Sequence, residues 1–177
     1  MDSSPGFSAP LSGVASRWLY AAEPIGTVSV EFSGTILVAL HPLLEQAECL
    51  PCLDPSHPLA QTLAAFAAAD FVAYERLRRR LPMRAPGTPF QQRVWHALQE
   101  IPLGRARSYG ELANTLCNAP RAVGQACRHN PIAILIPCHR VLAKKGLGGY
   151  SGKRDGVELA YKELLLRHEG VQYAPRV

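Results

Sequence analysis

The feature that most constrains the fold is an apolar run that ends at a proline and is followed directly by three reactive side chains. Residues 132–136 read Ile-Ala-Ile-Leu-Ile, a continuous apolar segment of the kind that lies inside a domain. Pro137 removes a backbone donor and bends the chain. The thiol of Cys138, the imidazole of His139 and the guanidinium of Arg140 come next. We therefore expect Cys138 to lie at a fixed corner between the core and a cleft.

The chain of 177 residues has room for one large domain or two small ones. Residues 1–16 are rich in Ser, Gly, Pro and Ala and are predicted to be a flexible leader. Prolines and a glycine within residues 82–87 predict a boundary between a domain of residues 17–86 and one of residues 87–177.

Basic residues are concentrated after the predicted boundary. The chain before residue 87 carries 6 Lys and Arg against 8 Asp and Glu, whereas the rest carries 13 against 6, a net charge of +7. A basic half favours a polyanionic partner such as nucleic acid. A solubilising surface explains the same charge about equally well.

No apolar run approaches the ~20 residues that a membrane span needs. The first residues lack the basic and apolar segments of a signal peptide. We expect the cytoplasm, or the nucleus in a eukaryote, and no contact with a membrane. The five cysteines are then expected to be reduced thiols.

Cys49 and Cys52, with His41 and His57 nearby, have the residue types of a zinc site. A single Cys-x-x-Cys pair is weak evidence, and ordinary thiols without a metal are the expectation. The remaining two thiols, at Cys117 and Cys127, fall at core-like positions of predicted helices and are expected to be inert.

The amino-terminal half predicts a small sheet and a helix. Residues 26–40 alternate apolar and polar side chains around Gly34, which predicts two short strands that turn at Ser33-Gly34. Residues 59–80 carry apolar side chains at helical spacing and predict one helix. The arginines at its end lie where cations favour the helix dipole, and this role is expected ahead of DNA contact.

The carboxy-terminal half predicts four helices. Two capping boxes, Thr88-Pro89-Phe90-Gln91 and Ser108-Tyr109-Gly110-Glu111, open helices that end before Pro102 and near residue 117. Residues 120–129 predict a short helix across a tight turn, so that the second and third helices make a helix-turn-helix candidate. Residues 155–168 predict a last helix, capped by Asp155 with Glu158 and stopped by Gly170.

Cys138, His139 and Glu169 have the residue types of a nucleophile, a base and the group that orients the base. A cysteine attacks as a thiolate, and a neighbouring base raises the thiolate fraction. Neighbouring side chains point apart, so Cys138 and His139 would communicate through a water. A buried thiol beside a surface histidine explains the same residues, and chemistry alone favours that simpler interpretation.

The segment Pro137-Cys138-His139-Arg140-Val141 resembles the active-site signature of the O6-alkylguanine-DNA alkyltransferases, and the resemblance extends over residues 87–170. It implies an α/β protein. A small amino-terminal domain with a sheet and helix, ribonuclease-H-like or ferredoxin-like, would precede a mainly helical, winged-helix-like domain with the helix-turn-helix. It also implies DNA repair by direct reversal. The alkyl group of O6-alkylguanine, and of O4-alkylthymine, would pass irreversibly to Cys138 in a single turnover without a cofactor.

The resemblance assigns roles to individual residues. Cys138 resembles the acceptor nucleophile, His139 its water-mediated base and Glu169 the orienting carboxylate. Asn130 resembles the residue that braces the active-site turn. Tyr109 resembles the general acid that protonates the leaving guanine. The residues expected to contact the substrate are Tyr109, Tyr150, Ser151 and Val141, the last two and Cys138 through backbone atoms.

The implied partner is double-stranded DNA carrying the lesion, bound by a monomer that flips the base out of the stack. Arg121 would fill the vacated space. The small residues Ala122, Gly124 and Ala126 would allow close approach to the minor groove. Arg128 is expected to contact phosphate, although a solvated helix face explains it equally well. The chain is longer than common members near residues 153–156, which is expected to lengthen a wall of the alkyl pocket.

Two other functions remain open at this point. A DNA lesion sensor would flip alkylguanine without accepting the alkyl group, but such a protein is expected to lack the cysteine. A cysteine hydrolase would use Cys138, His139 and Glu169 and turn over, but the sequence shows no motif for an oxyanion hole.

Overall fold

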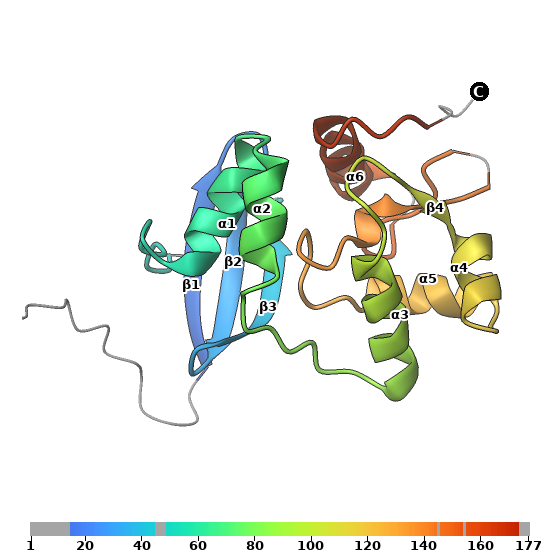
Figure 1. Ribbon diagram of the computed structural model, residues 1–177, viewed down its shortest axis with the longest axis horizontal. Helices are drawn as coiled ribbons and strands as arrows, with labels where there is room; N and C mark the ends of the chain where they lie inside the picture. The colour runs from blue at the N-terminus through green and yellow to red at the C-terminus, as the bar shows by residue number, and fades with distance from the viewer. Residues whose placement is uncertain (1–14, 45–48, 145, 154, 174–177) are drawn as a thin grey trace, which may run out of the picture.

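The computed structural model describes residues 15–44, 49–144, 146–153 and 155–173, which form a sheet-containing unit and a helical unit side by side (Figure 1). The sheet is antiparallel, in the order β1-β2-β3, with β1 at Ala15–Ala22, β2 at Gly26–Ser33 and β3 at Ile36–Pro42. The predicted pair of strands and their turn at Ser33-Gly34 are confirmed, and Gly34 has the positive φ of 62° that such a turn favours.

Strand β1 was not predicted. Ala15 and Ser16, assigned to the leader from their composition, begin this strand and pair with Ser33 and Phe32 of β2. The rest of the predicted leader lies outside the described residues. Because β1 is an edge strand with side chains that are mostly half-exposed, its sequence carries little of the alternation that marks a buried strand.

The single helix predicted over residues 59–80 is wrong. The structure has two helices, α1 (Pro58–Ala67) and α2 (Phe71–Arg78), which lie over one face of the sheet (Figure 1). Ala69 adopts a left-handed conformation with φ of 56°, which interrupts the helix. The side chain of Asp70 then accepts a hydrogen bond from the backbone N–H of Ala73 and starts the second helix.

The helical unit contains the four predicted helices: α3 (Pro89–Gln99), α4 (Tyr109–Thr115), α5 (Pro120–Arg128) and α6 (Gly156–His168). Both capping boxes are confirmed, with the side-chain and backbone bonds of each box formed. Asp155 occupies the cap position of α6 without a side-chain hydrogen bond, so its predicted capping role is wrong. Two further strands of two residues each, β4 (Arg107–Ser108) and β5 (Val141–Leu142), pair with each other in parallel.

The run of residues 132–136 is buried between the two units, as its composition predicted. Leu40 of β3 donates a hydrogen bond from its backbone to Pro131 and accepts one from Ala133. On the other side, the Trp95 indole of α3 donates to the carbonyl of Ala126 on α5 over 2.9 Å. The segment before Cys138 is therefore held by the sheet, while α3 holds the neighbouring helix.

The α/β class is confirmed, with a small antiparallel sheet and a mainly helical carboxy-terminal part. Within the part of the chain that is described, none of the helices has both the length and the apolar character needed to cross a lipid bilayer.

Replacing Thr88 by alanine removes the cap of α3 at the junction of the two units. The Thr88 hydroxyl accepts the backbone N–H of Gln91 over 3.3 Å, and such caps contribute about 1 kcal/mol. We expect Thr88→Ala to lower the free energy of unfolding by this amount in urea denaturation. Thr88→Ser, which keeps the hydroxyl, is the control and should remain within a few tenths of a kcal/mol of the parent. Equal stability of the alanine variant and the parent would contradict this account of the cap.

Candidate active site

Cys138 lies at the corner that the proline predicts, in a single turn of 3-10 helix formed by Cys138–Arg140. The side-chain amide of Asn130 braces this corner. Its nitrogen donates to the carbonyl of Ile136 over 2.7 Å and to the sulfur of Cys138 over 3.2 Å. Its oxygen accepts the backbone N–H of Ile132 over 3.1 Å. One buried amide thus fixes both ends of the apolar run and contacts the thiol.

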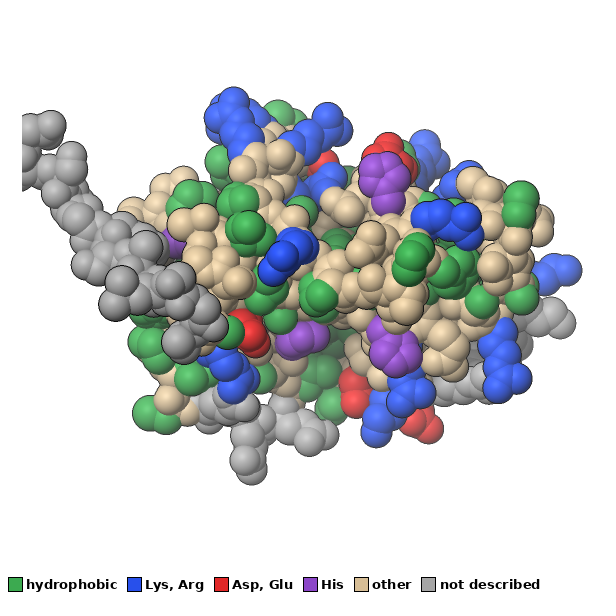
Figure 2. Space-filling model, turned by 90° about the horizontal axis from the view of Figure 1, so that it is seen from below, with side chains coloured by type: hydrophobic (Ala, Val, Ile, Leu, Met, Phe, Trp, Pro, Cys, Tyr) green, Lys and Arg blue, Asp and Glu red, His purple; other side chains and the backbone are tan. Residues whose placement is uncertain are grey.

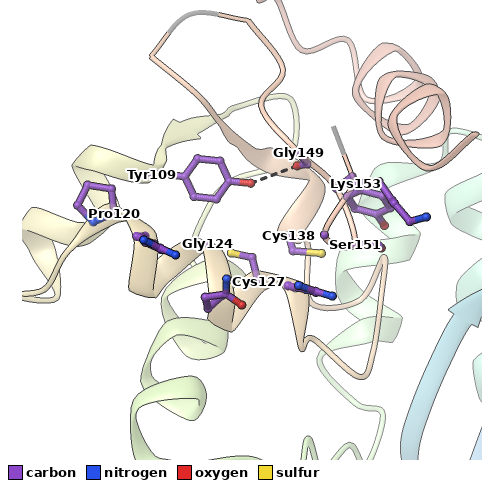
Figure 3. Close-up of a pocket in the computed structure, with 13 residues that line it drawn as sticks. Tyr109, Pro120, Gly124, Cys127, Cys138, Gly149, Ser151 and Lys153 are labelled. Carbon is purple, nitrogen blue, oxygen red and sulfur yellow. Dashed lines mark hydrogen bonds between the residues drawn. The ribbon is translucent and has the colours of Figure 1, made fainter. Parts of the chain in front are cut away.

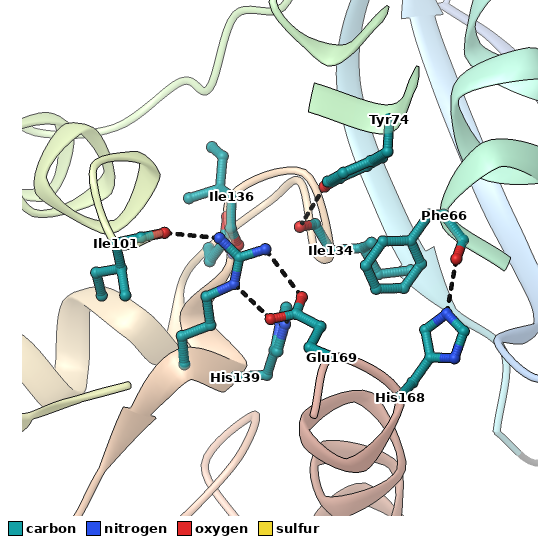
Figure 4. Close-up of polar contacts among 10 residues, drawn as sticks. Phe66, Tyr74, Ile101, Ile134, Ile136, His139, His168 and Glu169 are labelled. Atoms are coloured by element: carbon teal, nitrogen blue, oxygen red, sulfur yellow. Dashed lines mark hydrogen bonds and ion pairs between the residues drawn. The ribbon is translucent and has the colours of Figure 1, made fainter. Parts of the chain in front are cut away.

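His139 does not line the cavity that is described below, and its ring points into a buried ionic cluster (Figure 4). Its Nε2 lies 2.9 Å from Oε1 of Glu169. Arg140 donates from Nε to Oε2 of Glu169 over 2.7 Å, from its Nη2 to Oε1 over 2.9 Å, and from its Nη1 to the carbonyl of Ile101 over 2.7 Å. The Nδ1 atom of His139 is buried and has no hydrogen-bond partner among the described residues.

Burial and charge set the protonation states of this cluster. Burial alone would raise the pKa of Glu169, but its ionic hydrogen bonds to His139 and Arg140 outweigh burial and lower the pKa to about 2. Burial lowers the pKa of His139 despite the carboxylate beside it. At neutral pH, Glu169 is therefore an anion and His139 a neutral imidazole. The Nε2 hydrogen then points at the carboxylate, and Nδ1 carries a lone pair.

Burial raises the pKa of the Cys138 thiol, although the hydrogen bond from Asn130 and the charge of Lys162 act in the opposite direction. The resting sulfur is therefore a thiol. A base has to remove its proton before the sulfur can act as a nucleophile.

Cys138 opens onto a cavity of about 720 Å³ between α4, α5 and the glycine-rich loop of residues 146–152 (Figure 3). This volume is in the range of pockets that hold a small planar ligand. The cavity is lined by Tyr109, Pro120, Arg121, Gly124, Gln125, Cys127, Arg128, Cys138, Gly149, Tyr150, Ser151, Gly152 and Lys153. The predicted residues Tyr109, Arg121, Gly124, Arg128, Tyr150 and Ser151 are therefore gathered around the thiol.

Tyr109 lies at the start of α4, and its hydroxyl donates to the carbonyl of Gly149 over 3.2 Å. Burial raises the pKa of this phenol, and the thiols of Cys127 and Cys138 raise it further by smaller amounts. Tyr109 therefore stays protonated at neutral pH and remains a hydrogen-bond donor at the cavity.

Tyr150 is buried, and its hydroxyl adjoins the thiol of Cys138, where it helps to lower the pKa of that thiol. Burial, with a further effect of the neighbouring Cys138, raises the pKa of Tyr150 well above 10.0. Ser151 is exposed at the rim in a left-handed conformation with φ of 47°. Val141 is buried, and its carbonyl already accepts a hydrogen bond from Lys162, leaving one lone pair for a further donor.

Lys162 was not singled out from the sequence. It is fully buried on α6, and its Nζ donates to the carbonyls of Val141 over 2.6 Å, Leu147 over 2.7 Å and Gly149 over 3.1 Å. Burial lowers its pKa to about 8, so the ammonium is still charged at pH 7. This one side chain therefore ties the glycine-rich loop to Val141, at the end of the 3-10 turn. Its spacing to Leu165, Leu166 and Glu169, at i+3, i+4 and i+7, would have placed it on the buried face of the helix.

The exposed end of α5 presents Arg121, and its last turn presents Arg128. A Cβ atom at Gly152 would lie 2.5 Å from Nε of Arg128, so the guanidinium stem lies over this glycine at the rim of the cavity. Ala122 and Gly124 are partly exposed, as expected for residues of a contact face. The expectation for Ala126 is wrong, because this residue is buried and its carbonyl bonds Trp95.

Two expectations about the other cysteines need correction. Cys117 is exposed rather than part of the core. Cys127 is buried as expected, but it lines the cavity with Cys138. Cys49 and Cys52 are exposed, while His57 caps α1 by accepting the N–H of Leu59. Within the described residues, no group of three or more His, Cys, Asp and Glu side chains could hold a metal ion.

The basic residues of the carboxy-terminal half do not gather into one patch on the face shown in Figure 2, where acidic side chains lie between them. The positions of Arg121 and Arg128 therefore say more about where a polyanion would bind than the net charge does, because both residues line the cavity.

The ionic cluster predicts a specific acid sensitivity. The pKa of Glu169 is about 2 in the folded protein and 4.5 for an ordinary Glu, so between these pH values the folded protein binds fewer protons at Glu169 than the unfolded chain does. The stabilisation that the Glu169 carboxylate gives to the fold is therefore present above pH 4.5 and is lost as pH falls toward 2. Glu169→Gln should lower the free energy of unfolding at pH 7 by on the order of 3 kcal/mol. The difference from the parent should shrink as pH falls below 4.5 in urea titrations.

The matched control is Glu163→Gln on the same helix, which breaks an exposed pair with Arg167 and should cost below about 1 kcal/mol. A Glu169→Gln difference that stays constant from pH 7 to pH 3 would contradict the assigned protonation states.

Comparisons with known proteins agree with this geometry. Residues 89–171 match the family model of the 6-O-methylguanine DNA methyltransferase DNA binding domain. The methylated-DNA–protein-cysteine methyltransferase of Mycobacterium bovis is 41% identical over 133 residues, which cover 73% of this chain and 81% of that protein.

Solved structures give the same result over a larger part of the chain. The crystal structure of the Mycobacterium tuberculosis O6-methylguanine methyltransferase superposes with a TM-score of 0.70 and 33% identity, over 89% of this chain and 93% of that one. The structure of Mycobacterium tuberculosis OGT in complex with DNA superposes with a TM-score of 0.67 and 34% identity, over 87% of this chain and 92% of that one. From the matched domain, the relatives and the shared fold, we conclude that this chain belongs to the methylated-DNA–protein-cysteine methyltransferase family.

Proposed function

We propose that this protein repairs DNA by transferring the alkyl group of O6-alkylguanine, and of O4-alkylthymine, to the sulfur of Cys138. The observation that carries the proposal is the thiol itself. It lies at the floor of a base-sized cavity, accepts a hydrogen bond from Asn130 and adjoins a buried His139–Glu169 pair. Family membership agrees, because the relatives are named for transfer from methylated DNA to a protein cysteine.

Proton removal from Cys138 is the first step. Neutral His139, held by Glu169, has its Nδ1 lone pair free of any partner among the described residues. We assign Nδ1 the role of base, acting on the thiol through one water. The resulting imidazolium is stabilised by the Glu169 anion. The thiolate is stabilised by the amide of Asn130 and the nearby charge of Lys162.

The thiolate then attacks the alkyl carbon in line, forming a carbon–sulfur bond as the carbon–oxygen bond to guanine breaks. The electron pair of that bond stays on the purine, which needs a proton. Tyr109, whose high pKa keeps it protonated, donates toward the ring nitrogen in place of its present bond to Gly149. The carbonyls of Cys138 and Val141 and the N–H of Ser151 are assigned to the edge of the base.

The thioether has no leaving path, so each molecule acts once and no cofactor takes part. The cavity admits the base only after the base leaves the duplex.

Arg121 at the start of α5 is assigned to the vacated space, and Ala122 and Gly124 to the minor groove. Arg128 is assigned to phosphate. We further propose a winged-helix-like arrangement for this half, a ribonuclease-H-like one for the other, and action as a cytoplasmic monomer.

The two rival functions are less well supported. A lesion sensor has no use for the Asn130 bond to sulfur or the His139–Glu169 pair. A hydrolase needs donors aimed at a developing oxyanion beside the sulfur. The backbone N–H of Cys138 instead donates to the carbonyl of Ile136 over 2.8 Å.

The test of transfer is the mass of the protein. After incubation with duplex DNA containing O6-methylguanine, we expect the protein to gain one methylene mass, located on the peptide that contains Cys138. Cys138→Ser should show no gain in mass. Cys117→Ser, which removes an exposed thiol, is the control and should gain the same mass as the parent. An unchanged mass despite tight binding to the lesion would instead support the sensor, and repeated turnover the hydrolase.

Base flipping makes a separate prediction about Arg121. Arg121→Ala should slow repair of a duplex lesion by about tenfold or more, equivalent to about 1.4 kcal/mol, because the extruded state loses its wedge. The reaction with free O6-benzylguanine, which needs no flipping, should keep its rate. Arg167→Ala, an exposed arginine outside the cavity, should leave both reactions unchanged. Equal losses of Arg121→Ala on both substrates would argue against a role in flipping.

A further inference from the structure

The backbone at Ile134 is strained. Its φ of 68° lies in the left-handed region, which β-branched residues rarely adopt, and its side chain is fully buried. Such a conformation is unfavourable for an isoleucine and persists only where the surroundings impose it. Ile134 lies four residues before Cys138, so the strain is stored in the segment that carries the nucleophile.

Within the segment, the N–H of Leu135 donates to the carbonyl of Ala133 over 2.8 Å, and further groups that hold this conformation come from the amino-terminal unit. Tyr74 of α2 extends across the boundary, and its hydroxyl donates to the carbonyl of Ile134 over 3.2 Å (Figure 4). Leu40 of β3 binds the backbone of Pro131 and Ala133 on the preceding side. Tyr74 is completely buried, its ring lies 4.9 Å from that of Phe66, and burial raises its pKa. Its hydroxyl is therefore a permanent donor on a fixed ring.

The strained residue and the thiol are mechanically connected. Ile136 donates its N–H to Ile132 over 3.0 Å, and its carbonyl accepts both the amide of Asn130 and the N–H of Cys138. Relaxation of Ile134 toward an ordinary φ would rotate the peptide planes that follow and move the carbonyl of Ile136. Because the same Asn130 amide nitrogen bonds the sulfur, it could not keep both bonds if that carbonyl moved.

We propose that Tyr74 is a positioning residue for transfer to Cys138: its hydroxyl holds Ile134 in the left-handed conformation that sets the sulfur against Asn130. The inference rests on the proposed function, since it concerns the rate of the same transfer. It gives the amino-terminal unit a role in the chemistry. Tyr74 acts from α2, through its hydrogen bond to the backbone of Ile134, without touching the substrate.

The variant is Tyr74→Phe in the full chain, which keeps the ring and its contact with Phe66. The matched control is Tyr161→Phe. The Tyr161 hydroxyl also joins the two units by donating to a buried carbonyl, that of Ile25, over 2.9 Å, but it makes no bond to residues 130–138. Both variants lose one hydrogen bond of the same kind, so both should show a similar fall in thermal stability.

The decisive measurement is the rate of alkylation by free O6-benzylguanine, followed by intact mass well below the melting temperature. We expect Tyr74→Phe to lower the saturating rate constant about tenfold, equivalent to about 1.4 kcal/mol. The half-saturating concentration should change by less than about twofold, because the cavity walls remain. Tyr161→Phe should keep the parent rate constant.

Modification by iodoacetamide gives a second readout of the position of the sulfur. Peptide mass analysis should show a changed rate at Cys138 in Tyr74→Phe, while the exposed Cys49 and Cys52 react as in the parent. A parent rate constant in Tyr74→Phe, with only the stability loss of the control, would show that Tyr74 is merely structural. Absence of any mass gain in the parent protein would overturn the proposed function itself, a separate result.

Discussion

The buried carboxylate of Glu169 is the interaction on which the rest of the site depends. Burial alone would raise the pKa of this carboxyl, and its bonds to His139 and Arg140 keep it charged. Arg140 also donates from its Nη1 to the carbonyl of Ile101, which follows α3. Three parts of the chain, the segment after α3, the 3-10 turn and the end of α6, are therefore fixed to one another by one ion cluster.

This cluster also explains why Cys138 and His139 can serve one reaction although they are adjacent. The turn of 3-10 helix directs the sulfur to the cavity and the imidazole into the interior. Burial then selects the neutral form of His139 despite the Glu169 anion, and burial also keeps the sulfur protonated. The site is thus inactive as a nucleophile at rest and differs in this respect from exposed thiols that react by ionisation alone.

Local chemistry made much of the helical unit predictable. Capping boxes depend on hydroxyl and carboxamide groups three residues apart, and both were formed where the residues predicted them. The break at Ala69 was not predictable in this way, because alanine favours helix and the left-handed turn depends on the tertiary fold. Strand β1 was not predicted for a related reason, because an edge strand depends on pairing with its neighbour more than on a pattern in its own sequence.

The site shows the same division. The residues around Cys138 could be named from short motifs, and they meet at one cavity. The roles of Lys162 and Tyr74 were not predicted, because each side chain bonds backbone carbonyls. Every residue has a carbonyl, so the sequence does not indicate which one is the partner. Residues that bind the main chain of a distant segment need coordinates to be found, whereas residues that present chemistry to a cavity can be inferred from their types.

The bond between Trp95 and the carbonyl of Ala126 has a spectroscopic consequence. The indole is buried, and its polar edge contacts the helix that bears Arg121. Indole emission depends on the polarity and hydrogen bonding around the ring. The chain has one other tryptophan, Trp18, which lies in the sheet of the other unit. The protein therefore carries a natural optical reporter of any displacement of α5.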